Sequence, residues 1–440
     1  MMKSYRATVA VAALVALSGC GIFKGAPKKT PTVGTRVAIL TSENGVEADK
    51  TIADVQVLLP APAANDSWAQ PGGNPSKSMG QLALGDQPRR VWQAGIDGGS
   101  NRERLAAAPV VADNKLFVID VHASVHAFAA DTGASLWTAS IAEGKENQAA
   151  RFGGGVSFDD GKLYATDGVG DVVAMNAADG AILWRAKPGG PLRGSPTIAN
   201  GSVYVLTQDN QIFSLAQADG TVQWVQSGTL ETQGVFGVAA PAVSQGTVVA
   251  GFSSGELSAY RYENGRVLWQ DALSRTSITT SVSSLSDIDA APVIDDGRVY
   301  AVGQGGRMVA LELSTGQRLW EQNFAGISTP WIAGEWLFVV TDDARLVCLS
   351  RSSGKARWIA QLRRFGNEKK KKNGVTWYGP VLAGNRLILT NSRGEIVSVN
   401  PGDGSVVSTV EAKTAFTLPP IVANSTLYTL DQKGKISAYR

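Results

Sequence analysis

The chain has 440 residues, with 41 Lys and Arg against 38 Asp and Glu, 2 Cys, 2 His and a formal net charge of +3. This near balance argues against nucleic-acid binding through bulk positive charge, which needs a concentrated basic surface. Two cysteines exclude a disulfide-rich scaffold and any site with four cysteine ligands, and two histidines argue against a His-rich metal site.

Residues 1–19 have the layout of a secretory signal, because a short basic region precedes an apolar run over 7–17 that is too short to span a bilayer. Cys20 follows Leu17-Ser18-Gly19, a pattern that resembles the bacterial lipobox. We therefore expect the mature chain to begin at an acylated Cys20 that holds it on a membrane. An ordinary cleaved signal with an incidental cysteine is the alternative. By the same resemblance, Gly21 in place of Asp favours the outer membrane, with the protein facing the periplasm.

Residues 20–84 are rich in Pro, Gly, Ala and Ser, which is typical of a tether. Two short apolar runs interrupt this composition, at 36–40 and 55–59, and both are candidates for strands that fold back onto the main domain. Trp68 is a candidate to dock there as well. We expect this lipidated tether to lead into one folded domain that spans 85–440.

From about residue 88 the sequence repeats itself. Each unit contains a small residue followed by Pro, two short β-branched or aromatic runs, a third run that ends in small apolar residues, and a Gly-containing turn. A Trp stands four residues after that Gly, and successive Trp residues are 38 to 51 positions apart. The series consists of Trp92, Trp137, Trp184, Trp224, Trp269, Trp320 and Trp358. Four short strands in a unit of this length are typical of propeller blades.

The repeat contains eight first strands, so the sequence predicts an all-β fold, an eight-bladed β-propeller of four-stranded antiparallel blades. The last copy stops at Arg440, after its third strand, while 89–93 has the sequence of a fourth strand without a blade. We expect the N-terminal strand to complete the last blade and close the ring, because this removes a free sheet edge. The seventh copy, at Asp403 and Gly404, has Val at the Trp position or lacks the Trp.

A Trp that recurs in every blade indicates packing between blades rather than a platform for a cofactor or a carbohydrate. Cys348 stands where other copies carry Ala or Ser, so we interpret it as a small buried side chain. His122 and His126 have no acidic or cysteine cluster at ligand spacing, and no nucleophile with a base is recognisable. The sequence therefore predicts no catalytic residue, no metal site and no cofactor.

The loops that join each fourth strand to the next blade differ in length. The loop before Pro196 takes 12 residues from its Trp, whereas the loops before Pro292 and Pro380 take 23 and 22. Long loops on one side of a rigid scaffold are common binding sites. The last of these loops carries four lysines at 369–372. A solvated tip is the simplest interpretation, and contact with an acidic partner or an anionic membrane surface is the alternative.

The lipobox cysteine, the tether and the eight marked blades together resemble the BamB family, lipoproteins of the outer-membrane β-barrel assembly machinery. The blades alone also resemble quinoprotein propellers. The most specific element is Leu285-Ser286-Asp287-Ile288-Asp289, which is similar to the family's Leu-Ser-Asp-Val-Asp loop. The resemblance implies that Asp287 and Asp289 bind the periplasmic domains of the barrel-inserting subunit. A solvated acidic loop is the alternative.

A second family loop, just before the fourth blade, carries a Leu-x-Leu-Arg pattern. Here the corresponding stretch reads Gln233-Gly234-Val235-Phe236, so the Arg is missing. Part of the contact with the partner must therefore differ, and Val235 and Phe236 are candidates for apolar anchors in its place.

The resemblance implies a non-catalytic scaffold that binds the barrel-inserting subunit and offers strand edges to unfolded outer-membrane proteins, since an added strand gains main-chain hydrogen bonds with little demand on sequence. One alternative is a periplasmic quinoprotein dehydrogenase, which would need vicinal cysteines near the quinone, calcium ligands and a catalytic Asp. The other is a sugar- or peptide-binding lipoprotein, which a central pocket lined by convergent polar groups would favour.

Overall fold

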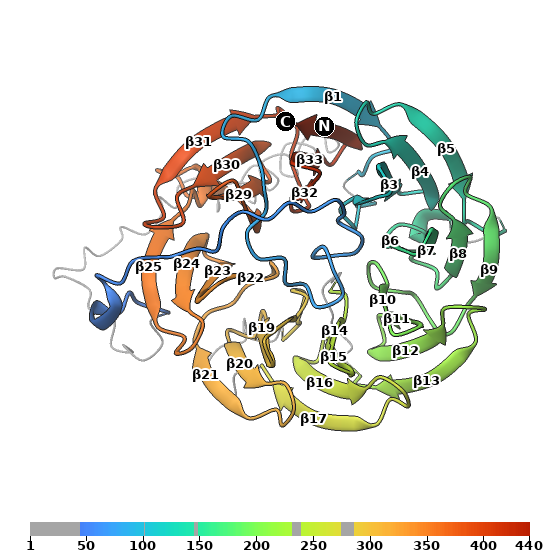
Figure 1. Cartoon of the computed structure of the whole chain (residues 1–440), viewed down its shortest axis with the longest axis horizontal. Coiled ribbons are helices and arrows are strands. Elements are labelled where there is room, and N and C mark those ends of the chain that lie inside the picture. Colours follow the sequence, from blue (N-terminus) through green and yellow to red (C-terminus); the bar gives the residue numbers. More distant parts are fainter. Residues whose placement is uncertain (1–44, 101, 145–147, 231–238, 274–285) are drawn as a thin grey trace, which may run out of the picture. The chain divides into compact units, whose positions relative to one another are not determined.

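The computed structural model describes residues 45–100, 102–144, 148–230, 239–273 and 286–440, and the segment Gly45–Arg440 is one compact unit. Its described strands form eight four-stranded antiparallel sheets and a two-stranded hairpin. Figure 1 shows the eight sheets placed around a common centre, with the first strand of most sheets innermost. The predicted eight-bladed β-propeller is confirmed. Within the described part of the chain, no helix is long and apolar enough to cross a bilayer.

The short strands follow the β-branched and aromatic runs of the sequence. Blades 1 to 4 contain β2 (Val110–Ala112), β3 (Lys115–Ile119), β4 (Ser124–Ala129), β5 (Ser135–Ser140); β6 (Val156–Asp159), β7 (Lys162–Thr166), β8 (Val172–Asn176), β9 (Ile182–Ala186); β10 (Thr197–Ala199), β11 (Ser202–Leu206), β12 (Gln211–Ala216), β13 (Val222–Ser227); and β14 (Ala242–Ser244), β15 (Thr247–Gly251), β16 (Glu256–Arg261), β17 (Val267–Ala272).

Blades 5 to 8 contain β18 (Val293–Asp295), β19 (Arg298–Val302), β20 (Met308–Glu312), β21 (Arg318–Gln322); β22 (Trp331–Ala333), β23 (Trp336–Val340), β24 (Arg345–Ser350), β25 (Ala356–Gln361); β28 (Trp377–Ala383), β29 (Arg386–Asn391), β30 (Glu395–Val399), β31 (Val406–Glu411); and β32 (Ile421–Ala423), β33 (Thr426–Leu430), β34 (Lys435–Tyr439), β1 (Arg90–Gly95). Short 3-10 turns lie at η2 (Lys50–Ile52) and η3 (Gln148–Ala150).

The eighth blade is built from both ends of the domain. β1 pairs antiparallel with β34, and Trp92 lies opposite Ala438. Beyond the strands, Arg89 and Arg440 exchange two backbone hydrogen bonds of 2.7 and 3.0 Å. The predicted closure of the ring is confirmed, and the pairing uses the sheet edge that β34 would otherwise expose.

Each Trp of the repeat packs against the next blade, as predicted. Trp184 of blade 2 is representative, because its Nε1 donates to the carbonyl of Gln217 in blade 3 at 3.1 Å. Gly220 lies against the indole so closely that a Cβ there would stand 2.6 Å from the ring. The same contact joins Trp92 with Gly133, Trp137 with Gly180, Trp224 with Gly265, Trp269 with Gly316, Trp320 with Gly354, and Trp358 with Gly404.

The seventh blade departs from this rule for a structural reason. Ser408 pairs with Ser398 in the register that Trp358 and Cys348 occupy in blade 6, so the residue at the Trp position is Ser408 and not Val. In blade 8 the chain ends between β34 and β1, where other blades have the glycine turn. A Trp on β31 would therefore have no glycine to pack against. Cys348 itself is fully buried, as expected.

Residues 63–84, here called the strap, cross the centre of the ring along the innermost strands (Figure 1, blue). The strap forms hydrogen bonds with all eight blades in order. Its contacts are Asn65 with blade 8, Trp68 with blade 1, Ala69 with blade 2, Gln70 with blade 3, Pro75 with blade 4, Ser76 with blade 5, Gly80 with blade 6, and Leu82 with blade 7.

Of the three predictions made for the tether, one is confirmed, one is not, and one cannot be checked. Trp68 docks, with only 4% of its surface exposed and its ring stacked on Trp331 at 6.0 Å between centroids. The run at 55–59 is not a strand, although Arg357 of β25 donates to the carbonyl of Val55. The run at 36–40 lies outside the described residues.

Lys77 is the most unusual residue of the strap. Its backbone has a φ of 65°, its side chain is fully buried, and its Nζ lies 3.1 Å from Thr197 Oγ1. Burial lowers its pKa to about 7, and none of the carboxylates in the described part of the chain forms an ion pair with it.

Candidate functional site

The loops that lead from one blade to the next emerge on one side of the ring, here called the loop face. The predicted Asp-Ile-Asp element lies there, between β17 and β18. Its central residue, Ile288, is fully buried, and a Cβ on Gly251 would stand 2.4 Å from it. The Ile288 amide donates to the carbonyl of Phe252 at 3.2 Å. The apolar residue therefore anchors the loop in the core and fixes the two aspartates on either side.

Asp289 forms an ion pair with Arg193, which lies in the loop before blade 3. Arg193 Nη2 and Asp289 Oδ1 are 3.2 Å apart, and the two side chains are only 3% and 10% exposed. Gln304 donates to the other oxygen of Asp289. This ion pair joins the loop before blade 3 to the loop before blade 5, so it connects two blades that are not neighbours in the ring.

The carboxyl of Asp289 titrates well above the ordinary range of an aspartate. Burial raises its pKa to about 6, the positive charge of Arg193 opposes this rise, and the nearby Asp287 adds to it. Asp287 is only 1% exposed, and its carbonyl accepts from the Gln304 amide at 2.8 Å. The loop is therefore not a solvated acidic loop, and its charges are held inside a polar cluster.

The structure brings together Asp287 and Asp289 and adds Arg193, which the sequence analysis missed. The signal was present, since Leu192 and Arg193 form a Leu-Arg pair, but it stands one blade earlier than the family pattern. The partner-binding role of the two aspartates stays a prediction. Cys20, Val235 and Phe236 lie outside the described residues.

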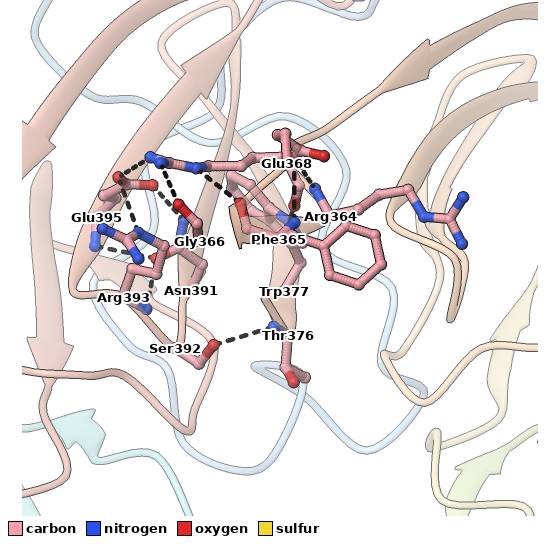
Figure 2. Close-up of polar contacts among 11 residues, drawn as sticks. Arg364, Phe365, Gly366, Glu368, Thr376, Trp377, Asn391, Ser392, Arg393 and Glu395 are labelled. Atoms are coloured by element: carbon pink, nitrogen blue, oxygen red, sulfur yellow. Dashed lines mark hydrogen bonds and ion pairs between the residues drawn. The ribbon is translucent and has the colours of Figure 1, made fainter. Parts of the chain in front are cut away.

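The loop before blade 7 forms a second candidate site, a hairpin shown in Figure 2. Its strands are β26 (Phe365–Asn367) and β27 (Lys372–Gly374). Glu368 Oε1 accepts hydrogen bonds from the amides of Arg364 and Phe365, both 3.1 Å long. At the base, Trp377 Nε1 donates to the carbonyl of Arg363 at 2.9 Å. The lysines at 369–372 therefore sit on an ordered turn, and all four are exposed.

The hairpin is tied to blade 7 through Glu395 (Figure 2). Glu395 Oε1 lies 3.4 Å from Arg363 Nη1 and 3.8 Å from Arg393 Nε. Its other oxygen accepts from Asn391 Nδ2 at 2.7 Å. A further contact joins the Thr376 amide to Ser392 Oγ at 3.0 Å. These contacts hold the base of the hairpin in a fixed direction.

A cavity of about 850 Å³ lies beside the strap, away from both sites. Its lining is polar and includes Asp66, Asp113, Asp159, Asp160, Asn74 and Asn200. One of these carboxylates is already engaged, since Gln217 Nε2 donates to Asp159 at 2.6 Å.

Comparisons with known proteins agree on one family. The family model described as outer membrane protein assembly factor BamB matches residues 121–360, more than half of the chain. The protein of that name from Yersinia pestis is 27% identical over 357 residues, covering 80% of this chain and 88% of the relative. The one from Escherichia coli K12 is also 27% identical, over 79% of this chain and 88% of the relative.

Solved structures share the fold. BamB from Moraxella catarrhalis superposes with a TM-score of 0.63 at 18% identity, over 80% of this chain and 97% of that one. Quinohemoprotein alcohol dehydrogenase from Comamonas testosteroni reaches a TM-score of 0.65 at 13% identity, over 86% and 81%. At such identities a structural likeness shows the propeller fold alone, so the sequence match over 121–360 decides the family. The chain belongs to the BamB family of outer membrane protein assembly factors.

Proposed function

We propose that the chain is a non-catalytic scaffold subunit of the machinery that assembles outer-membrane β-barrel proteins. Its relatives are named as assembly factors. Within that machinery, it binds the periplasmic domains of the barrel-inserting subunit through the loop face around Arg193 and Asp289. The observation that supports this site is the ion pair that joins loops from two non-adjacent blades.

The buried ion pair gives the loop face a fixed pattern of charge. Removing two ions from water costs several kcal/mol, so such a pair is weak evidence for stability and better explained by positioning. Arg193 and Asp289 hold two loops at a constant separation across blade 4. A preformed surface loses little entropy when a partner binds. This suits a scaffold whose task is to hold another protein in place.

The proposal includes the organisation of the chain. Residues 1–19 direct export, Cys20 carries the lipid that holds the protein at the outer membrane facing the periplasm, and the propeller over 85–440 does the binding. The contacts made by Trp68 and Leu82 support a tether whose later part is bound to the ring.

Unfolded outer-membrane proteins are a second class of partner in this proposal. β31 is the outermost strand of blade 7, and all six of its residues are exposed. It carries Val406, Val407 and Val410, and β-branched residues favour strand pairing. An extended segment that pairs with this edge would gain main-chain hydrogen bonds with little demand on its sequence.

A charge swap tests the proposed binding site. We expect Arg193→Asp or Asp289→Arg alone to destabilise the fold by about 3–5 kcal/mol, because each breaks the buried ion pair and places two like charges together. The double variant restores the pair and most of the stability, but it reverses the polarity of the ion pair that lies beneath the proposed binding surface. Co-purification of the barrel-inserting subunit from membranes should therefore fall at least about tenfold.

The matched control is the same swap at Arg318 and Asp271, an ion pair of 2.5 Å between the outer strands β21 and β17. It should leave co-purification unchanged. A folded Arg193→Asp, Asp289→Arg variant that still retains the partner at the original yield would contradict the site.

A further inference from the structure

We propose that the hairpin over 363–374, here called the basic hairpin, rests on anionic lipid headgroups of the membrane that holds the N-terminus, and so sets the tilt of the ring. This inference rests on the lipid anchor proposed above, and it names a second contact with the same membrane. The contact is electrostatic and needs no insertion into the bilayer core.

The charge of the basic hairpin is concentrated and mostly uncompensated, since among the described residues Arg363 is the one of its cations that forms an ion pair, with Glu395. Its cationic residues are Arg363, Arg364, Lys369, Lys370, Lys371 and Lys372, and its one carboxylate is Glu368. Glu368 already accepts from two backbone amides. Among the described residues, no carboxylate lies within ion-pair distance of the four lysines. The whole chain has a net charge of only +3, so this hairpin is a local excess of positive charge.

The propeller does not require this hairpin. The loop before blade 3 manages the step between blades in 12 residues from its Trp, against 22 here, and the hairpin adds no residue to the apolar core beyond its base at Leu362 and Val375. It is nevertheless ordered, since Phe365 pairs with Gly374 and Asn367 with Lys372. An ordered turn that presents four ammonium groups loses little conformational entropy on binding an anionic surface.

The described chain begins beside the base of the basic hairpin, at the same end of blade 6. Arg345 Nη1 donates to the carbonyl of Val46 at 3.1 Å, near the first described residue. Arg345 is paired in register with Gln361, the last residue of β25, and the hairpin begins two residues later. Cys20 is separated from Gly45 by 24 residues. The chain that leads back to the anchor therefore departs from beside the base of the hairpin.

Two side chains at the base suit a membrane surface. Arg364 Cζ lies 5.7 Å from the centre of the Phe365 ring, so the cation covers an aromatic face. The Arg364 side chain is exposed, and that of Phe365 is half-buried. Such a pair suits the boundary between water and lipid headgroups. The aromatic ring and the apolar stem of the arginine can lie against the membrane surface, while the guanidinium stays among water and headgroups. An acidic protein would fit the lysines but gives no reason why the described chain begins beside the hairpin.

The test uses the full-length acylated chain, reconstituted in vesicles of phosphatidylcholine alone or with about one third phosphatidylglycerol. A water-soluble amine reagent modifies exposed lysines, and mass spectrometry measures each one. We expect modification at 369–372 to fall at least about fivefold in the anionic vesicles and to recover in high salt, which screens the attraction. Lys187 and Lys433, exposed elsewhere on the loop face, should keep their rates.

Two double variants test whether the protection depends on the charge of the hairpin or on the total charge of the chain. With Lys370→Gln and Lys371→Gln, the remaining Lys369 and Lys372 should lose most of their protection. The matched variant, Lys433→Gln with Lys435→Gln, removes the same charge elsewhere and should preserve it.

Equal modification in the two kinds of vesicle overturns the proposal, and so does protection that appears only after an acidic protein of the assembly machinery is added. A chain that does not float with the vesicles overturns the lipid anchor and this inference together. A chain that floats with its lysines unprotected overturns the hairpin contact alone.

Discussion

At the scale of single residues, the contact between Gly220 and Trp184 shows how the repeat is enforced. The glycine has a φ of 77°, and the indole occupies the space where a Cβ would stand. Both the backbone conformation and the close approach exclude a side chain. Gly297 has nearly the same φ, 71°, but nothing lies within 4 Å of its Cβ position. Alanine substitutions at the two positions therefore separate the cost of backbone strain from the cost of overpacking against the indole.

We expect Gly220→Ala to lower the free energy of unfolding by about 2–4 kcal/mol, because it adds overpacking to strain. Gly297→Ala should cost only about 1 kcal/mol, from strain alone. Urea denaturation followed by tryptophan fluorescence measures both. Equal losses for the two variants would show that the indole contact does not restrict the glycine.

Lys77 makes the second prediction at this scale, about pH. Its pKa is lowered from 10.5 to about 7 by burial, so between these values the unfolded chain binds more protons than the folded one. The free energy of unfolding therefore rises with pH across this window. Lys77→Met should remove this rise and stabilise the fold at pH 7. In the original chain, folding either strips water from the Lys77 ammonium or removes its proton, and both cost free energy that methionine does not require.

Thermal melts at pH 7, 8 and 9 check this expectation for the original chain and the variant. Lys187→Met, at an exposed position, is the control and should keep the original pH dependence. A Lys77→Met variant that melts earlier at pH 7 would contradict the interpretation of Lys77 as a buried, unpaired cation.

At the scale of elements, β1 is the one strand that closes the ring without a covalent turn to its neighbour in the sheet. It is held by its ladder with β34 and by Trp92, whose Nε1 donates to the carbonyl of Ala130 at 3.1 Å. Every other strand of the blades is joined to its partner by a turn of the chain. Loss of one side chain should therefore free β1 more readily than an interior strand.

We expect Trp92→Ala to cost about 3–5 kcal/mol and to raise amide hydrogen exchange selectively in β1 and β34. Trp224→Ala removes the same side chain within a covalently continuous blade. It should cost a similar amount but leave exchange in β1 and β34 slow. If both variants release β34 equally, the closing strand is no weaker than the others.

The elements also show what the sequence could and could not predict. Blades were predictable because Trp184, Gly220 and their equivalents repeat at fixed offsets. The strap was not, because residues such as Pro75 and Ser76 contact the ring through backbone carbonyls, which leave no pattern in side chains. The run at 55–59, a candidate strand by its sequence, is not one, because Val57 and Leu59 pack against the core without strand pairing.

Within the candidate site, the sequence predicted Asp287 and Asp289 but not their burial or their partner. An alignment of loops assigns a role to one blade at a time, whereas Arg193 reaches Asp289 from two blades away. Contacts between loops of non-adjacent blades join residues with no constant spacing in the chain. Sequence periodicity therefore predicts the blades and leaves the contacts between distant loops undetermined.

At the scale of the whole molecule, the two sides of the ring have different tasks. The strap contacts all eight innermost strands, and the chain uses its own residues to cover that region. The loop face carries the Arg193–Asp289 pair and the basic hairpin, the first proposed for a protein partner and the second for lipid. A scaffold with two such contacts on one face would hold its partner at a fixed orientation to the membrane.

The pairing of β1 with β34 also has a consequence in time. Synthesis delivers β1 long before β34, so β1 must wait, unpaired, until the five residues of β34 have been made. Folding that depends on such a distant contact is slow to complete. A chain that lacks β34 would have seven complete sheets and an open ring, so the architecture itself makes β34 a condition of closure.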